Sequence, residues 1–366
     1  MSDLYQRSIQ IILENQAGSG AYIASPHFPT YHYCWFRDGA FCAHAMDRVG
    51  EHASAARFHD WAARAILDRA EVVRRATAAA RPGCPPAAED QLHTRYTLEG
   101  QDGTREEWPN YQLDGLGTWL WSLNEHLQGK VRAAPPEWLA AARLAGSYLE
   151  ALWQTPCYDC WEEFPQDIHP YTLASIYGGL QALSRLDGQD RGGTLGGLRD
   201  FLFQNAVYDG YFVKKVGSYT VDASLLGLAV PYRMVALDDP HYRATLQRIE
   251  ACLVGGGGVH RYPTDTYYGG GEWLLLAGWL GWVYARGGQP GQAARLLAWM
   301  EASADPEGAL PEQVPATLND PNYYQPWLQR WGPIARPLLW SHAKYLILRT
   351  ELEATSRAQA DRQVRS

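Results

Sequence analysis

The amino-acid sequence predicts an all-α protein, an (α/α)6 barrel in which six helical hairpins close into a ring. Apolar residues recur at i, i+3, i+4 and i+7 in twelve segments, whereas strand-like alternation is nearly absent. Every second segment begins with a motif of aromatic and polar residues, and these segments also carry glycines. Inner helices running one way and outer helices the other would bring the six motif loops to one mouth. We therefore expect a pocket formed by the loops that precede the inner helices.

The twelve predicted helices alternate between plain and motif-bearing starts. They cover residues 3–16, 38–49, 52–79, 112–129, 136–154, 170–187, 192–206, 221–229, 239–253, 270–287, 290–304 and 334–354. The even-numbered segments hold the glycines that tight packing at the axis of a ring requires. An α-solenoid, the competing helical layout, predicts a recurring sequence unit, and none is visible. Short hairpins are expected within 208–213 and 259–262.

The composition favours one domain that spans residues 1–366. Hydrophobic residues make up 46% and charged residues 20%, and no linker divides the chain. The net charge is -8, with acids and bases interspersed, so we expect no nucleic-acid partner and no membrane partner. The start lacks a signal-peptide pattern and no run of about 20 apolar residues occurs, which favours the cytoplasm. We expect a monomer or a weak homo-oligomer.

The cysteine and histidine patterns predict neither a metal site nor a cofactor. The six cysteines are scattered through a long chain, which is typical of free thiols. Cys157 and Cys160 form a C-x-x-C pair, but no second pair accompanies it. The 11 histidines show no ligand spacing with the acids, which disfavours a metal-dependent hydrolase.

The aromatic residues point to a sugar ligand. The chain has 15 Trp and 22 Tyr, many of them beside Gly, Pro, Asp or Arg in polar loops. An aromatic residue at helical spacing normally belongs to the core. In a polar loop, a flat apolar face with a polar tip suits an amphipathic sugar ring.

The most informative motif is Trp161-Glu162-Glu163, two adjacent carboxylates behind a large aromatic residue. Two consecutive acids ordinarily mark a solvated helix N-terminus, which the helix dipole stabilises. Here Pro165 and Pro170 follow, so the acids lie in a loop rimmed by apolar surface. Loops on a rigid scaffold carry function, and this one becomes a hypothesis for catalysis.

Other motif loops supply further hypotheses. Asp38 alone would be a helix cap, but Arg37 beside it and Tyr31 and Trp35 upstream favour binding of vicinal hydroxyls. Arg261 and Tyr267 precede three glycines and a long buried helix. Weaker signals come from four residues that could equally belong to a lid or to a helix cap. They are Trp108, Gln112, Asp114 and Asp222.

Glu312 lies in a segment bounded by prolines, where a glutamate is ordinarily a solvated surface charge. Its expected position in the fold favours a functional role instead. In a toroid of six hairpins, the loop of Glu312 would face the loop of Glu162 across the mouth.

Together these motifs resemble glycoside hydrolase family 15, the glucoamylases and their glucodextranase, isomaltose-hydrolysing and trehalase relatives. The resemblance runs from about residue 31 to 342 and implies an (α/α)6 barrel. It implies that Glu162 is the catalytic acid and Glu312 the catalytic base. It also implies that the substrate is bound by Tyr31, Trp35, Arg37, Asp38, Trp108, Gln112, Asp114, Trp161, Glu163, Arg261, Tyr267 and Trp340.

The expected function is an inverting, exo-acting α-glucoside hydrolase that releases glucose from short oligosaccharides. Glu162 should carry a raised pKa because of apolar neighbours and nearby acids, while Glu312 stays ionised and activates water. An α-1,6, isomaltose-type specificity is preferred, with an α-1,4 glucoamylase or a trehalase as alternatives. A non-catalytic carbohydrate-binding toroid would be expected to lose one acid, and both are present.

Overall fold

The computed structural model describes residues 4–105, 107–128 and 134–365, and it is mostly helical. Residues 3 and 129, at the ends of two predicted helices, lie outside this part. The longer helices are α1 (Leu4–Glu14), α2 (Phe36–Arg48), α3 (His52–Leu67), α4 (Ala70–Ala79), α5 (Asp114–Leu127), α6 (Pro136–Leu152), α7 (Pro170–Asp187), α8 (Gly192–Asn205), α9 (Pro240–Leu253), α10 (Leu274–Arg286), α11 (Pro290–Ala302), α12 (Tyr324–Trp331) and α13 (Leu339–Arg365). A 3-10 helix, η2 (Ala223–Leu228), lies between α8 and α9.

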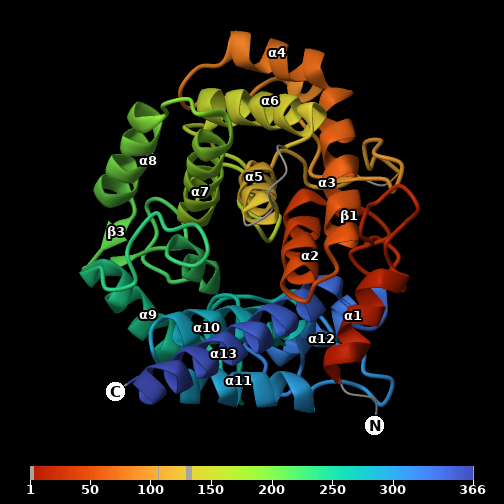
Figure 1. Ribbon diagram of the computed structural model, residues 1–366, viewed down its shortest axis with the longest axis vertical. Coiled ribbons are helices and arrows are strands. Elements are labelled where there is room, and N and C mark those ends of the chain that lie inside the picture. Colours follow the sequence, from red (N-terminus) through yellow and green to blue (C-terminus); the bar gives the residue numbers. More distant parts are fainter. Residues whose placement is uncertain (1–3, 106, 129–133, 366) are drawn as a thin grey trace.

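The helices form two concentric layers, which confirms the predicted (α/α)6 barrel (Figure 1). In the inner layer α2, α5, α7, η2, α10 and α13 contact one another in this order, and α13 closes the ring against α2. Around them pack α3, α6, α8, α9 and α11, each against the inner helix before it in the chain. The first helix, α1, is the outer partner of the last, α13. The predicted alternation of outer and inner helices is therefore confirmed.

Glycines let the inner helices approach closely, as predicted. A Cβ atom on Gly179 of α7 would lie 2.5 Å from the carbonyl oxygen of Gly117 on α5. A Cβ atom on Gly117 would in turn lie 2.4 Å from the carbonyl oxygen of Ser175. Because no Cβ atom fits at such distances, α5 and α7 can touch backbone to backbone only with glycine at both positions.

The structure corrects several helix boundaries. Segment 52–79 is two helices rather than one, because the chain turns at Arg69, whose guanidinium binds Asp102 and the carbonyl oxygens of Ala65 and Gly100. The apolar spacing continues across this turn, so it gave no sign of the break. The last helix begins at Leu339, after Pro337, and not at residue 334. Helix α12 was not predicted, and segment 221–229 is the 3-10 helix η2.

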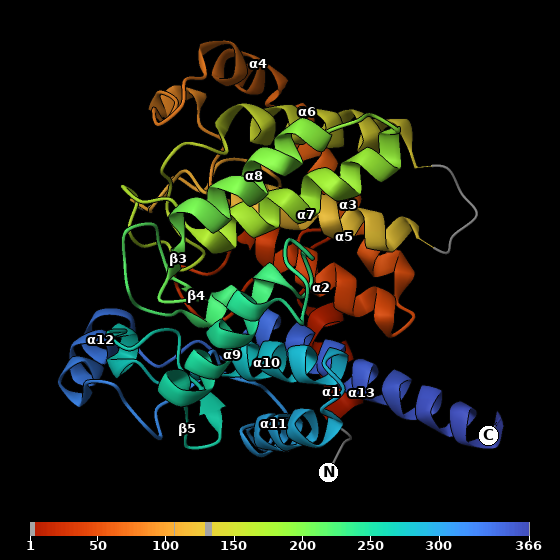
Figure 2. The same cartoon turned by 90° about the vertical axis from the view of Figure 1, so that its left-hand side faces the viewer.

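Short strand pairs hold the motif loops at one mouth. Strand β1 (Cys34–Trp35) pairs with β2 (Arg95–Tyr96), and β7 (Glu272–Trp273) pairs with β8 (Gln313–Val314). The predicted hairpin within 208–213 is β3 (Val207–Tyr208) with β4 (Tyr211–Phe212). The other hairpin, β5 (Val254–Gly255) with β6 (Gly258–Val259), lies just before its predicted position. Figure 2 shows α12 and the β3–β4 hairpin at one end of the ring and the end of α13 at the other.

Across the described ranges, no helix has both the length and the apolar character that crossing a membrane requires.

Candidate active site

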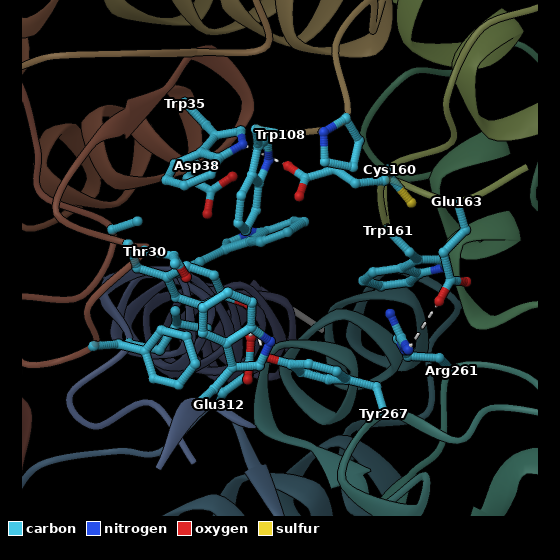
Figure 3. Close-up of a pocket in the computed structure, with 18 of the residues that line it drawn as sticks. Thr30, Trp35, Asp38, Trp108, Cys160, Trp161, Glu163, Arg261, Tyr267 and Glu312 are labelled. Atoms are coloured by element: carbon cyan, nitrogen blue, oxygen red, sulfur yellow. Dashed lines mark hydrogen bonds and ion pairs between the residues drawn. The ribbon is translucent and has the colours of Figure 1, made fainter. Parts of the chain in front are cut away.

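A cavity of about 350 Å3 lies at the mouth where the inner helices begin. Twelve of the fourteen residues predicted for the site line it, and Figure 3 shows most of them. They are Tyr31, Trp35, Arg37, Asp38, Trp108, Trp161, Glu162, Glu163, Arg261, Tyr267, Glu312 and Trp340. Gln112 and Asp114 do not line it.

The loop that carries Glu162 has an unusual backbone conformation. Glu162 has a φ of 66°, in the left-handed region that non-glycine residues rarely adopt. Asp159 supports this turn because its Oδ1 accepts hydrogen bonds of 2.9 Å from the backbone N–H groups of Trp161 and Glu163. Such conformations persist where the surroundings hold them, and they are common at functional sites.

A buried lysine holds the same loop through two ion pairs. The Nζ of Lys214 lies 3.0 Å from Asp159 and 2.7 Å from Asp222. Asp222 caps η2, as its sequence position suggested, and also accepts a 3.0 Å hydrogen bond from Nε1 of Trp161. Although burial opposes ionisation, Lys214 holds the pKa of Asp159 below its ordinary value. Three buried charges thus fix both the backbone and the indole ring beside Glu162.

The carboxyl group of Glu162 is suited to carry a proton. Desolvation raises its pKa to about 7, although Arg37 and a hydrogen bond from Trp35 act in the opposite direction. That hydrogen bond runs from Nε1 of Trp35 to Oε1 over 2.5 Å. The raised pKa agrees with the expectation from the apolar neighbours.

Glu312 reaches the cavity through strand pairing. Its neighbour Gln313 pairs with Trp273 in the β7–β8 sheet, and its own N–H donates to the carbonyl oxygen of Ala335. The side chain is only 3% exposed, Oε1 accepts a 3.2 Å hydrogen bond from the Tyr31 hydroxyl, and Oε2 has no hydrogen-bond partner among the described residues. Figure 3 shows Glu312 across the cavity from Trp35, the residue that binds Glu162.

Burial also raises the pKa of Glu312, to about 8, and the nearby Arg261 only partly offsets this. The expectation that Glu312 stays ionised is therefore not met in this structure. The sequence pattern could not reveal this, because the depth of burial is set by elements distant in the chain.

Arg37 is held in place by a layer of polar residues. Its guanidinium lies 3.3 Å from both Asp38 and Asp114, and it donates a hydrogen bond to Gln112. Gln112 and Asp114 contact Arg37 and do not line the cavity. Their positions therefore do not support the direct contact with substrate that was expected for them. Burial raises the pKa of Asp38 to about 6, against the effect of Arg37.

A second cationic group lies on the other side of the cavity. Nε of Arg261 donates a 2.8 Å hydrogen bond to Asp265, and Nη2 lies 3.4 Å from Glu163. Glu163 also accepts a 2.5 Å hydrogen bond from the hydroxyl of Tyr262. Arg261 and Glu163 together offer donors and acceptors that match sugar hydroxyls.

Aromatic rings make the walls and the base. Trp35 packs edge to face against Tyr31 and Trp108, with ring centroids 5.8 and 6.0 Å apart. At the base, Trp340 stacks on Phe41 of α2 with an interplanar angle of 16°. These rings give the cavity apolar walls on which a sugar ring can pack.

Sequence reasoning missed part of the lining. Trp273 belongs to β7, and a single tryptophan ahead of a helical segment gave no separate signal. Trp327, Arg330 and Trp331 come from the unpredicted helix α12. The spacing of Trp327 and Trp331, one helical turn apart, was the available signal.

A cluster outside the cavity bears on the expectation of no metal site. Asp47, His59 and His126 bring possible ligand atoms within 4.8 Å of one another. His126 already binds Asp47 at 2.8 Å, and its ring lies against that of His59. These contacts account for the cluster as a buried polar network.

Two carboxyl groups among indole rings at the mouth of a helical barrel are an arrangement that suits a glycoside hydrolase. Residues 1–303 match the family described as Glycosyl hydrolases family 15. The chain is 40% identical to the isomaltose glucohydrolase of Kribbella flavida over 96% of this chain and 93% of that protein. The chain therefore belongs to glycosyl hydrolase family 15 and is a glycoside hydrolase.

Solved structures agree with this assignment. A glycosidase variant in complex with glucose has a TM-score of 0.91 at 40% identity, with 96% of each chain covered. A bacterial glucoamylase complexed with acarbose has a TM-score of 0.73 at 20% identity, covering 96% of this chain and 55% of that one. The second likeness supports the barrel fold.

Proposed function

We propose that the protein is an inverting, exo-acting α-glucoside hydrolase that removes one glucose from the non-reducing end of short α-1,6-linked oligosaccharides. The observation that carries this proposal is the pairing of Glu162 and Glu312 in one cavity, each held by a different aromatic hydrogen-bond donor. Two carboxyl groups are what glycoside hydrolysis needs.

Glu162 acts as the general acid. Its raised pKa lets it keep a proton at neutral pH, and it delivers this proton to the departing glycosidic oxygen. Its rigid loop supports this role, because a proton donor must be aimed at one atom of the substrate.

Glu312 acts as the general base. It removes a proton from a water molecule as that water attacks the anomeric carbon. The positive charge that develops on the sugar ring during the reaction favours ionised Glu312.

The pKa order has a consequence for the rate. The pKa of Glu162 is about 7 and that of Glu312 is about 8. The proposed roles need the reverse order, because the acid must be protonated while the base is ionised. Consider the protein molecules that carry one proton between the two carboxyl groups. Roughly one in ten of them has this proton on Glu162, because one pKa unit is a factor of ten. We expect a bell-shaped dependence of kcat/KM with limits near pH 7 and pH 8 that belong to the pair.

Arg37, Asp38 and Arg261 hold the terminal glucose through its hydroxyl groups, and Trp340 forms the base on which it rests. Glu163 binds the sugar beyond the cleaved bond. Gln112 and Asp114 act through Arg37, as their positions behind it suggest. A cavity of about 350 Å3 is small for a ligand site, which favours short substrates.

The preference for α-1,6 linkages is supported by the 40% identity to an isomaltose glucohydrolase over nearly the whole of both chains. An α-1,4 specificity and trehalose hydrolysis are the alternatives. The trehalase of Thermoplasma acidophilum is 24% identical over 68% of this chain and 45% of that protein, a weaker likeness.

A substrate panel tests the specificity. The purified protein is incubated with isomaltose, panose, maltose and trehalose, glucose release is quantified, and the first anomer formed is followed by NMR. We expect the highest kcat/KM on isomaltose and β-glucose as the first product. Faster hydrolysis of maltose or trehalose would overturn the linkage, and α-glucose as the first product would overturn inversion.

Substitution of each carboxyl group tests the mechanism. We expect Glu162→Gln and Glu312→Gln each to lower kcat by several orders of magnitude while isomaltose binding persists in calorimetry. Near-normal activity in either variant removes that residue from the scheme.

A further inference from the structure

A second cavity, of about 500 Å3, lies at the far end of the barrel. The inner helices begin at the active-site mouth, so their last turns reach the opposite mouth. Three of these helices line the second cavity with their C-terminal halves: α2 with His44 and Arg48, α5 with Trp121 and Glu125, and α10 with Trp282 and Arg286. None of these residues lines the active-site cavity.

Two of the arginines have an ordinary structural explanation. Arg48 and Arg286 are the last residues of α2 and α10, where a positive charge offsets the helix dipole. Arg48 lies 2.8 Å from Glu351, and Arg286 binds the same carboxylate. These two charges are therefore accounted for without a ligand.

The other two arginines form no ion pair of this kind with a described residue, although, against the larger effect of burial, the positive charge of Arg233 lowers the pKa of Glu125. Arg199 lies within α8 and Arg233 in the loop after η2, and both line the cavity and are exposed. Within the described part of the chain, neither side chain has an ion pair or a hydrogen bond, and Arg199 only lies 6.0 Å from the ring of Phe203. Arg233 also has a φ of 53°, a backbone conformation that a non-glycine residue adopts at a free-energy cost.

The remaining lining offers two further kinds of contact. Glu125 is half-buried, and its carboxylate accepts no hydrogen bond from the described residues. On the wall, His44 lies against the rings of both Trp121 and Trp282, with centroids 4.7 and 5.9 Å away. The cavity thus combines unpaired guanidinium groups, a carboxylate acceptor and an aromatic wall.

We propose that this far-mouth cavity binds a small phosphorylated sugar. The guanidinium groups of Arg199 and Arg233 take the phosphate, since Arg is suited to bidentate recognition of phosphate oxygens. Glu125 accepts hydrogen bonds from the sugar hydroxyls, and the wall formed by Trp121 covers the apolar face of the ring. An uncharged sugar lacks the group that the two arginines require, whereas inorganic phosphate lacks the part that meets Glu125.

Calorimetry tests this proposal with three probes: glucose 6-phosphate, inorganic phosphate and glucose. Binding of the sugar phosphate at the active site is separated by repeating each titration in the presence of saturating glucose, which occupies that site. We expect glucose 6-phosphate still to bind under this condition, at least about tenfold more tightly than inorganic phosphate, and its binding to weaken as salt is added. Loss of binding in saturating glucose, or equal affinity for the two phosphates, would overturn the proposal.

The matched variants are Arg199→Gln with Arg233→Gln, compared with Arg243→Gln. Arg243 is an exposed residue of α9 that does not line the cavity. We expect the double variant to lose at least tenfold in affinity for glucose 6-phosphate. Its kcat and KM on isomaltose, measured without glucose 6-phosphate, should be unchanged. Arg243→Gln should bind glucose 6-phosphate as the unaltered protein does. Unchanged affinity in the double variant, or equal loss in Arg243→Gln, counts against the site. Thermal unfolding checks that each variant is folded.

Discussion

Trp35 donates a hydrogen bond of 2.5 Å from its indole Nε1 to Oε1 of Glu162. Across the cavity, the hydroxyl of Tyr31 donates to Glu312 over 3.2 Å. The two rings meet edge to face, with centroids 5.8 Å apart. Two touching aromatic rings from a single motif loop therefore donate hydrogen bonds to both carboxyl groups.

Removal of the indole donor should shift the pH profile. A hydrogen bond donated to a carboxylate favours its ionised form, so Trp35→Phe raises the pKa of Glu162 above about 7. Because the pKa of Glu162 sets the lower limit of the kcat/KM profile, we expect the limit near pH 7 to move to higher pH by roughly half a unit or more, while the limit near pH 8 stays in place. Trp108→Phe is the control, since Trp108 packs on Trp35 and its Nε1 has no partner among the described residues. An unmoved profile in Trp35→Phe would contradict this role.

Burial of Glu312 should lower stability at alkaline pH. Its pKa of about 8 in the folded protein exceeds the ordinary value of 4.5. The carboxyl group is neutral in both states below pH 4.5; as the pH rises toward 8 only the unfolded chain ionises, and stability falls. Since glutamine does not ionise, we expect Glu312→Gln to gain roughly 4 kcal/mol relative to the unaltered protein between pH 5 and pH 8.5. Chemical denaturation at both pH values measures this, and Glu307→Gln, at an exposed loop position, should show no such trend.

Lys214 should matter for both stability and catalysis. Lys214→Met leaves the buried carboxylates of Asp159 and Asp222 without their counter-charge, which costs about 3–5 kcal/mol. Because Asp159 holds the turn at Glu162, we also expect a lower kcat on isomaltose in the fraction that remains folded. Lys215→Met is the matched control: its pair with Asp167 is partly exposed, and its loss costs less than about 1 kcal/mol. Equal effects at the two positions would contradict the assignment of the buried cluster.

Glycine packing at the barrel axis can be tested by a pair of alanine substitutions. The added methyl of Gly179→Ala would lie 2.5 Å from a backbone oxygen of α5, so α5 and α7 must separate, at a cost of about 1–3 kcal/mol or more. Gly196, within the outer helix α8, has open space at the Cβ position. There alanine should stabilise the protein by roughly 0.5–1 kcal/mol. Unfolding in urea distinguishes the two; destabilisation by Gly196→Ala would contradict this explanation.

Much of the fold could be predicted because helical periodicity is a local property. The alternation of plain and motif-bearing helix starts identified the inner and outer layers, and the glycines of α5 and α7 lie where the ring packs most closely. The turn at Arg69 could not be located, since long-range hydrogen bonds decide it. The start of α13 was placed too early because the apolar spacing was followed across Pro337, which is a local signal for a helix boundary. Helix α12 has only eight residues, too few for the periodicity to stand out from its loop.

The amino-acid sequence by itself determined which residue types are available at each helix start, and with them the two acids, the two arginines and the aromatic rings of the site. Only the tertiary structure decided how deeply each group is buried and what it contacts. It buried Glu312 enough to raise its pKa to about 8, moved Gln112 and Asp114 behind Arg37, and brought the rings of α12 to the cavity. The physical reason is that desolvation and contact depend on the whole ring of packed helices, whereas residue type and helical spacing are local.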